Sequence, residues 1–313
     1  MTRILTRTDL LRLLEPGPGL DALRDGFLLQ SPGKSTHKTV AALPFPGVAT
    51  ALLPGVLPGI EAWTVKINAK FPGADPALRG LVCLHGGRDG ELLAVLDSAT
   101  ITSWRTGLSA ALAIDALAPV TPSDELTLGV IGAGAQAYTT LAGLAHLRVW
   151  QDLLVHDIVP ERASILASHY GGRTAACAAD VAASADVVLL ATWPTRPVLR
   201  LSDTRPAQHL TSLGSDEQGK RELAADLLNA AAVVVDDLEL ARSFGVLSAP
   251  GAPLQACTLK EVLTSSSTQL RTDRRQRTVY APVGMPWQDL ALSWLLHRAA
   301  EEQDIGTLVD WLS

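Results

Sequence analysis

The sequence predicts an α/β fold, and three observations support this prediction. Between residues 127 and 236, short apolar segments alternate with helical patterns, which is the βαβ rhythm of a parallel sheet. The first of these segments ends in the glycine turn Gly132-Ala133-Gly134. Residues 38–96 show short apolar runs cut by Pro and Gly, which are typical of an antiparallel sheet. We therefore expect a parallel-sheet domain and a second, α+β domain.

The first part of the chain predicts helices around a sheet. Residues 8–29 indicate a helix pair broken at Pro16-Gly17-Pro18-Gly19, and residues 86–90 indicate a hairpin turn. A helix with small residues on one face is expected from Ser98 to Leu117. The strands between these helices are expected at Thr39–Leu43, Ala49–Leu53, Ala62–Lys66, Gly80–His85 and Leu92–Leu96.

The second part begins after a linker at Pro119–Asp124. The last helix, from Pro286 to about Gln303, is expected to pack on the first part. The predicted domains are then 1–118 with 283–313, and 119–282. The parallel strands are expected at Thr127–Ile131, Asp152–His156, Val187–Ala191, Gln208–Leu213 and Ala232–Asp236.

Composition excludes several classes of function. With a net charge of −6 and a pI near 5.6, the chain has no general attraction to nucleic acid or to an anionic membrane. The basic cluster Arg271–Arg277 is interrupted by Asp273 and indicates a solvated loop or a strand end. The spacing of cysteines and histidines predicts neither a disulfide framework nor a metal site. The N-terminal residues do not resemble a signal peptide, and no run is apolar enough for a membrane helix, so we expect a cytoplasmic protein.

The glycine turn is the strongest functional signal. Gly132 allows the tight turn out of the strand, and Gly134 lets backbone N–H groups approach a pyrophosphate at the start of the next helix. Ala135 and Gln136 open that helix, and Ala137 is small enough for close packing. This pattern is the fingerprint of a dinucleotide-binding Rossmann domain. A glycine turn in an ordinary α/β domain is the weaker alternative.

Asp157 closes the next strand, where an acid accepts from the ribose hydroxyls of NAD and repels the 2′-phosphate of NADP. We therefore expect NADH as the preferred cofactor and NADPH as a possible one. Thr192 and Trp193 follow a later strand and are expected beside the nicotinamide half; a plain turn is the alternative.

Four further residues are candidates for substrate chemistry. Arg105 lies near the start of an apolar helix, where its guanidinium suits a carboxylate, although pairing with a structural acid is the alternative. Lys66 lies in an apolar strand, on the same face as Thr64 and Asn68. That face is equally compatible with exposure to solvent. Asp216 follows a strand of the parallel sheet, at the edge where ligands bind, or else caps a loop. Lys38 is a second cation for an acidic substrate, or an ordinary surface lysine.

Together these residues resemble the ornithine cyclodeaminase/mu-crystallin family. The matching segments cover most of the chain, and the Thr102–Thr106 motif before the glycine turn is fairly specific. The matching segments are Val65–Asn68, Ile101–Thr106, Gly129–Ala137, Leu213–Asp216, Arg221–Leu223 and Val283–Ala291. The resemblance implies a homodimer with an NAD(P) cofactor. It implies that 119–282 is the NAD(P)-binding Rossmann domain and that 1–118 with 283–313 form the substrate-binding and dimerisation domain. It implies that Lys66 and Arg105 hold the substrate carboxylate and that Asp216 faces the reacting carbon–nitrogen centre.

The chain departs from the cyclodeaminase pattern. A glutamate expected about a dozen residues before the lysine is replaced by the apolar run Ala51–Pro54, and Ser98-Ala99-Thr100 stands for a Glu-Met-Thr. An arginine expected near residue 38 is absent, with Lys34 or Lys38 as a substitute. We therefore expect an NAD(P)H-dependent reductase of small cyclic imino acids, with catalysis by Lys66, Arg105 and Asp216. A cyclodeaminase with recycled NAD+ and an inert nucleotide-binding protein are the alternatives.

Overall fold

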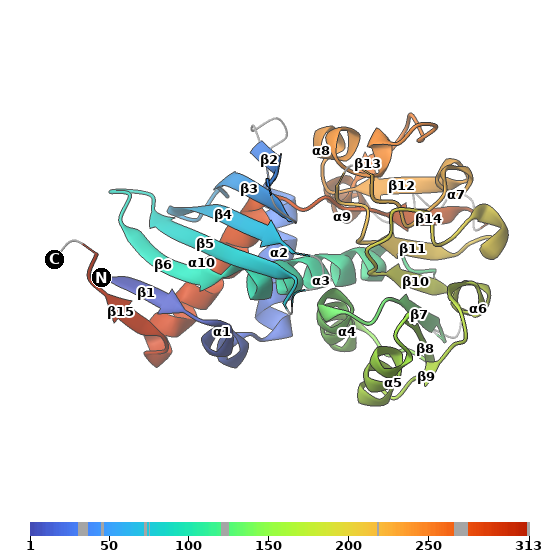
Figure 1. The fold of residues 1–313 in the computed structure, drawn as a ribbon, viewed down its shortest axis with the longest axis horizontal. Coiled ribbons are helices and arrows are strands. Elements are labelled where there is room, and N and C mark those ends of the chain that lie inside the picture. The colour runs from blue at the N-terminus through green and yellow to red at the C-terminus, as the bar shows by residue number, and fades with distance from the viewer. Residues whose placement is uncertain are drawn as a thin grey trace. The chain divides into compact units, whose positions relative to one another are not determined.

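The computed structural model describes residues 1–30, 37–44, 47–71, 74, 76–119, 125–217, 219–265 and 275–311. The chain divides into two compact units (Figure 1). Unit 1 comprises Met1–Arg105 and Met285–Ser313, and unit 2 comprises Thr106–Gly284. The helix α3 (Ser98–Leu117) begins in unit 1 and continues into unit 2. The predicted linker lies almost wholly outside the described residues, as do Lys34 and Arg271–Arg274 of the basic cluster.

Unit 1 contains a seven-stranded sheet in the order β15-β1-β6-β5-β4-β3-β2. The neighbours from β2 to β6 pair antiparallel, as predicted, whereas β1 pairs parallel with β6. The tight turn at residues 86–90 is present, with Gly90 N donating to Gly86 O at 3.1 Å. The strands are β1 (Thr2–Leu5), β2 (His37–Ala42), β3 (Val48–Gly55), β4 (Ala62–Lys70), β5 (Leu78–Gly86), β6 (Leu92–Asp97) and β15 (Thr307–Val309).

Helices α1 (Arg7–Leu13), α2 (Pro16–Leu29) and α10 (Pro286–Gln303) belong to the same unit. The predicted helix pair is present, but its break lies at Leu14 and Glu15, because Pro16–Gly19 form the first turn of α2. Proline is tolerated there because the first N–H groups of a helix have no partner within it. Helix α10 packs on α2 and on the sheet, and Gly26 allows the ring of Trp287 to approach the α2 backbone.

The two faces of the sheet in unit 1 have an unusual distribution of polarity. On β4, Thr64, Lys66 and Asn68 point to the buried face, whereas Ile67 points outward and is 58% exposed. Its neighbour on β5, Leu81, is 52% exposed. The predicted alternation of β4 is confirmed, and its polar face is the buried one.

Unit 2 contains an eight-stranded sheet in the order β13-β12-β14-β11-β10-β7-β8-β9, and every described pairing in it is parallel. This is the parallel sheet that the alternating pattern predicts. The chain leaves β7 toward β8 on one side and returns to β10 on the other, which makes β7 and β10 the switch point where ligands bind in such sheets. The strands are β7 (Thr127–Ile131), β8 (Asp152–His156), β9 (Arg173–Thr174), β10 (Val187–Leu190), β11 (His209–Ser212), β12 (Ala231–Val235), β13 (Cys257–Thr258) and β14 (Arg277–Tyr280).

The helices of unit 2 connect these strands. Their bounds are α4 (Ala135–Leu147), α5 (Pro160–His169), α6 (Ala178–Ser184), α7 (Ala225–Asn229), α8 (Leu238–Ser243) and α9 (Leu259–Thr264), with 3₁₀ turns at Leu201–Asp203 and Val246–Ser248. An apolar core of aliphatic side chains, including Val188, Leu210 and Val279, is buried among them. Strand β14 was not predicted, although it pairs with both β11 and β12 inside the sheet.

Candidate active site

Lys66 lies in a buried apolar row that crosses the sheet of unit 1. The strand register places Leu52 and Val82 directly beside it on the neighbouring strands, and both are buried. Opposed residues in paired strands share one face of the sheet. Lys66 is therefore a cation in an apolar setting, with only 1% of its surface exposed.

Two helices of unit 1 provide the polar contacts of Lys66. Its Nζ donates to the carboxylate of Asp289, on α10, at 2.7 Å, and to Thr102 Oγ1, on α3, at 3.4 Å. Burial lowers the pKa of Lys66 from 10.5 to about 7. The carboxylate of Asp289 opposes this change, while the charges of Arg105 and Lys38 add to it.

Arg105 lies one turn after Thr102 on α3 and is also buried. Its Nη1 donates to Gln288 Oε1 at 3.1 Å, and its Nε lies 3.4 Å from Asp289 Oδ1. Among the described residues, Arg105 Nε has no hydrogen-bond partner. The predicted pairing with a structural acid is therefore present, and the guanidinium keeps a donor for a further acceptor.

Lys38 lies on β2, opposite Leu52 and in the same cross-strand row as Lys66. Adjacent strands are about 4.8 Å apart, so the two lysine backbones are separated by roughly 10 Å. The structure places Lys38 close enough to lower the pKa of Lys66. Its role in substrate binding remains a prediction.

The glycine turn of unit 2 has the geometry that its sequence requires. Gly132 has φ +94°, a conformation that favours glycine, and a Cβ there would lie 2.5 Å from Ala191 O. Gly134 is the N-cap of α4, and no described atom lies within 4 Å of where its Cβ would be. No described side chain caps α4. The backbone N–H groups of Ala135 and Gln136, in its first turn, are therefore placed to bind an anion.

Asp157 follows β8 and holds the glycine turn. Its Oδ2 accepts from Ala133 N at 2.7 Å, and its Oδ1 accepts from Val159 N at 2.8 Å. A carboxylate with two such oxygens has lone pairs left for the hydroxyl groups of a ribose. The residues present therefore fit a dinucleotide, with the pyrophosphate at α4 and the adenosine ribose at Asp157.

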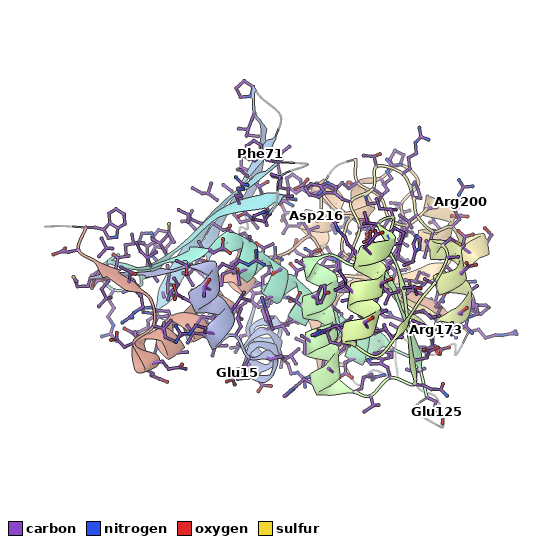
Figure 2. All side chains as sticks on the ribbon, turned by 60° about the horizontal axis from the view of Figure 1, so that its bottom comes forward. Glu15, Phe71, Glu125, Arg173, Arg200 and Asp216 are labelled. Carbon is purple, nitrogen blue, oxygen red and sulfur yellow. The ribbon has the colours of Figure 1, made fainter. Side chains whose placement is uncertain are left out.

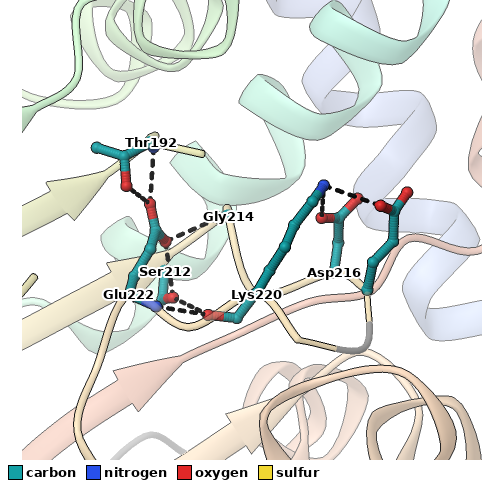
Figure 3. Close-up of polar contacts among 8 residues, drawn as sticks. Thr192, Ser212, Gly214, Asp216, Lys220 and Glu222 are labelled. Atoms are coloured by element: carbon teal, nitrogen blue, oxygen red, sulfur yellow. Dashed lines mark hydrogen bonds and ion pairs between the residues drawn. The ribbon is translucent and has the colours of Figure 1, made fainter. Parts of the chain in front are cut away.

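Glu222 joins the loops that follow β10 and β11 (Figure 3). Its Oε1 accepts from Thr192 N at 2.7 Å and from Thr192 Oγ1 at 2.6 Å. Its Oε2 accepts from Gly214 N at 2.7 Å and from Ser212 Oγ at 2.8 Å. Burial raises the pKa of the Glu222 carboxyl, and these bonds act in the opposite direction. Thr192 is thereby held beside the glycine turn.

Asp216 lies on the loop after β11, as its sequence predicts (Figures 2 and 3). Lys220 Nζ lies 3.2 Å from Asp216 Oδ1 and 3.0 Å from the carboxylate of Glu217. The same ammonium lies 4.5 Å from the ring centroid of Trp193. Lys220 therefore connects Asp216 to Trp193, two residues that the sequence predicts separately.

Sequence reasoning assigned no role to Asp289, Gln288, Glu222 or Lys220. The available signal for Asp289 and Gln288 was a pair of polar residues in the first turn of a helix that continues with the apolar run Leu290-Ala291-Leu292. The available signal for Glu222 was a charged residue between a strand and a helix, at the edge of the parallel sheet where ligands bind. Within the described ranges, no group of three His, Cys, Asp or Glu residues has the arrangement of a metal site. No described helix has the length and apolar composition needed to cross a bilayer.

Known proteins resemble this chain over most of its length. A model of the ornithine cyclodeaminase/mu-crystallin family matches residues 23–304. The alanine dehydrogenase of Archaeoglobus fulgidus is 26% identical, covering 98% of this chain and 98% of its own. The ketimine reductase mu-crystallin of Mus musculus is 28% identical, over 78% and 79% of the two chains.

Among solved structures, the Δ1-pyrroline-2-carboxylate reductase of Thermococcus litoralis, in complex with NADH and L-proline, has a TM-score of 0.87 and 25% identity. The match covers 98% of this chain and 100% of that one. The likeness confirms the predicted fold class, an α/β protein with a Rossmann-type parallel sheet.

Proposed function

Because the chain belongs to the ornithine cyclodeaminase/mu-crystallin family, we propose that it reduces the C=N bond of small cyclic imino acids with NAD(P)H. The proposed substrates are Δ1-pyrroline-2-carboxylate, giving proline, and Δ1-piperideine-2-carboxylate, giving pipecolate. The observation that carries the proposal is the buried Lys66–Arg105 pair, in a chain that also has the dinucleotide-binding turn of unit 2.

The pair suits a substrate with one carboxylate. Arg105 is always cationic, and its contacts with Gln288 and Asp289 use only part of its five N–H donors. Lys66 is buried between Leu52 and Val82 of the neighbouring strands, and an ion pair in such a setting is stronger than in water. We assign carboxylate binding to these two residues, with Lys38 as a further cation.

Cofactor binding is assigned to unit 2. Gly132, Gly134, Ala135 and Gln136 would hold the pyrophosphate, Asp157 the adenosine ribose, and the Thr192–Trp193 segment the nicotinamide half. When bound, the nicotinamide supplies the hydride for the imine carbon. The carboxylate of Asp157 favours NADH, because it would repel the 2′-phosphate of NADPH.

Asp216 is proposed to stabilise the protonated C=N nitrogen or to relay its proton. A carboxylate supports a cationic iminium by charge, and Lys220 Nζ lies 3.2 Å from Asp216 Oδ1. The side chain of Asp216 is 28% exposed, so a proton can also reach it from solvent.

The outer face of the sheet in unit 1 supports a homodimer. Ile67 and Leu81 are more than half exposed, and Val65, Cys83 and Val95 lie on the same face. Adjacent exposed apolar side chains mark an interaction surface. A second copy of the chain is the proposed partner, and a molar mass from light scattering that equals one chain would contradict this. The cytoplasmic location remains a prediction.

The proposal is tested by following NADH and NADPH oxidation with both imino acids at neutral pH. Rapid turnover, with a higher kcat/KM for NADH, is the expected result. Ammonia release from ornithine or lysine without added reductant would instead identify a cyclodeaminase. Tight NADH binding without any turnover would identify an inert binding protein.

Substitution of Arg105 tests the site. Arg105→Ala removes a charge-assisted contact worth roughly 1.5–3 kcal/mol, so kcat/KM should fall by about one to two orders of magnitude. The matched control is Arg24→Ala, which removes an exposed arginine on α2 and should leave the kinetics unchanged. Equal kinetics for the Arg105 and Arg24 variants would show that Arg105 is structural.

A further inference from the structure

Asp289 is a buried carboxylate in unit 1 that contacts both Lys66 and Arg105, the two residues assigned to carboxylate binding. It lies in the first turn of α10 and has 1% of its surface exposed. Its carboxylate is 2.7 Å from Lys66 Nζ and 3.4 Å from Arg105 Nε. A buried charge with two such partners is costly to place unless the arrangement is specific.

The charges of this cluster fit a single carboxylate. Lys66 and Arg105 together carry two positive charges, and Asp289 neutralises one of them. The three side chains then carry a net charge of +1, which is balanced when one substrate carboxylate binds. Two adjacent buried cations without Asp289 would repel each other, and the lysine would lose its proton because an arginine cannot.

We propose that Asp289 is a positioning residue that holds Lys66 and Arg105 side by side and favours the ammonium form of Lys66, so that both can receive the substrate carboxylate. This inference rests on the proposed function for the identity of the ligand. The contacts of Gln288 support it, because its Oε1 accepts from Met285 N at 3.0 Å and from Arg105 Nη1 at 3.1 Å. Gln288 thus connects the N-terminus of α10 to Arg105.

The charged groups that act on Lys66 come from three elements. Asp289 on α10 favours the ammonium, while Arg105 on α3 and Lys38 on β2 disfavour it. With burial included, the pKa of Lys66 is lowered to about 7. Removing the carboxylate leaves only influences that lower this pKa, so the protonated fraction of Lys66 at neutral pH should fall.

The test compares Asp289→Asn with the unmodified protein in the absence of substrate. The chain has few lysines, so 13C-labelled lysine side chains give a resolvable NMR spectrum in which Lys66→Met assigns one signal. The Lys66 signal should titrate near pH 7 in the unmodified protein. In the Asn variant its midpoint should fall by about 1–3 pH units. An unchanged midpoint would overturn the inference.

Kinetics provide the second readout. At pH 7.5, Asp289→Asn should raise KM for the imino acid by about tenfold or more, with a smaller change in kcat, and should move the optimum of kcat/KM to lower pH. Asp289→Glu keeps the charge and should restore the titration midpoint. If the Asn variant does not fold, the Glu variant carries the test: its displaced carboxylate should raise KM, and an unchanged KM would contradict the positioning role.

A matched control separates positioning from stability. Ser293→Ala changes another buried polar residue one turn later on α10, and it should leave the Lys66 titration and the pH optimum unchanged. Equal effects of the Ser293 and Asp289 variants would show a merely structural role. A shifted Lys66 titration in a protein that reduces neither imino acid would contradict the proposed function alone.

Discussion

Replacement of Glu222 by glutamine is the most demanding test of the structure of unit 2. The carboxylate is completely buried and accepts four hydrogen bonds, two from Thr192 and one each from Ser212 and Gly214. Glutamine has the same shape, but one of its two acceptor oxygens becomes an NH2 group. The hydroxyl of Ser212 can rotate to accept from this group, whereas a backbone N–H cannot.

The cost of the substitution follows from these contacts. Either Gly214 N–H or Thr192 N–H loses its acceptor, which costs about 1–3 kcal/mol, and the remaining bonds lose the contribution of the negative charge. We expect a total of about 3 kcal/mol. For a domain of this size, 1 kcal/mol corresponds to about 2–4 °C, so Tm should fall by about 6–12 °C.

Thermal unfolding monitored by circular dichroism measures the fall in Tm. Fluorescence titration with NADH measures the loss of cofactor affinity that follows when Thr192 is no longer held in place. NADH should bind more weakly to Glu222→Gln. Because burial raises the pKa of Glu222 above its value in the unfolded chain, the folded state binds a proton first as pH falls. The unmodified protein is then stabilised and the Gln variant is not, so the difference in Tm between them should widen. The control is Glu302→Gln, an exposed residue at the end of α10, where we expect less than about 0.5 kcal/mol. Equal Tm values for the two variants would refute the reasoning.

Three further predictions concern the glycine turn, Lys66 and the contact between α2 and α10. Gly132→Ala should lower the free energy of unfolding by at least about 2 kcal/mol, because φ is +94° and the new Cβ meets Ala191 O. Gly134→Ala should preserve Tm in thermal unfolding but weaken NADH binding in a fluorescence titration. The pKa of Lys66 is lower in the folded state, about 7 against 10.5, so the unfolded state binds more protons between these values. Denaturant titrations should therefore show that stability rises from pH 7 to 10 more steeply than in Lys66→Met. Gly26→Ala places a methyl group against Trp287 and should lower the free energy of unfolding by about 1–3 kcal/mol; an unchanged urea midpoint would contradict that packing.

Much of the fold can be predicted from local signals. Helices α3 and α10 match their predicted bounds, because a proline opens α10 and the pattern of apolar residues in α3 ends with its last turn. Strands β7 and β8 match theirs because glycine and aspartate end the apolar runs. Strand β1 is different, since Arg3 interrupts its pattern. Its guanidinium is satisfied by Ile305 O at 2.7 Å, a partner distant in the sequence.

The candidate site shows a similar limit. The residue types at Lys66, Arg105 and Asp157 indicate their chemistry because a charge in an apolar segment requires a partner. The partners themselves depend on tertiary packing, as the contact between Lys66 and Asp289 shows across 223 positions of the chain. Local pattern also could not decide which face of β4 is buried, because α10, which covers its polar face, lies at the other end of the sequence.

The proposed reaction transfers a hydride from the cofactor to the imine carbon of a cyclic imino acid. The most direct measurement uses NADH deuterated at C4 of the nicotinamide, with Δ1-piperideine-2-carboxylate and Δ1-pyrroline-2-carboxylate, and mass spectrometry of the products. Pipecolate and proline should carry deuterium at C2 when one of the two C4 positions of the cofactor is labelled. Unlabelled products from both labelled cofactors, or no product at all, would contradict it.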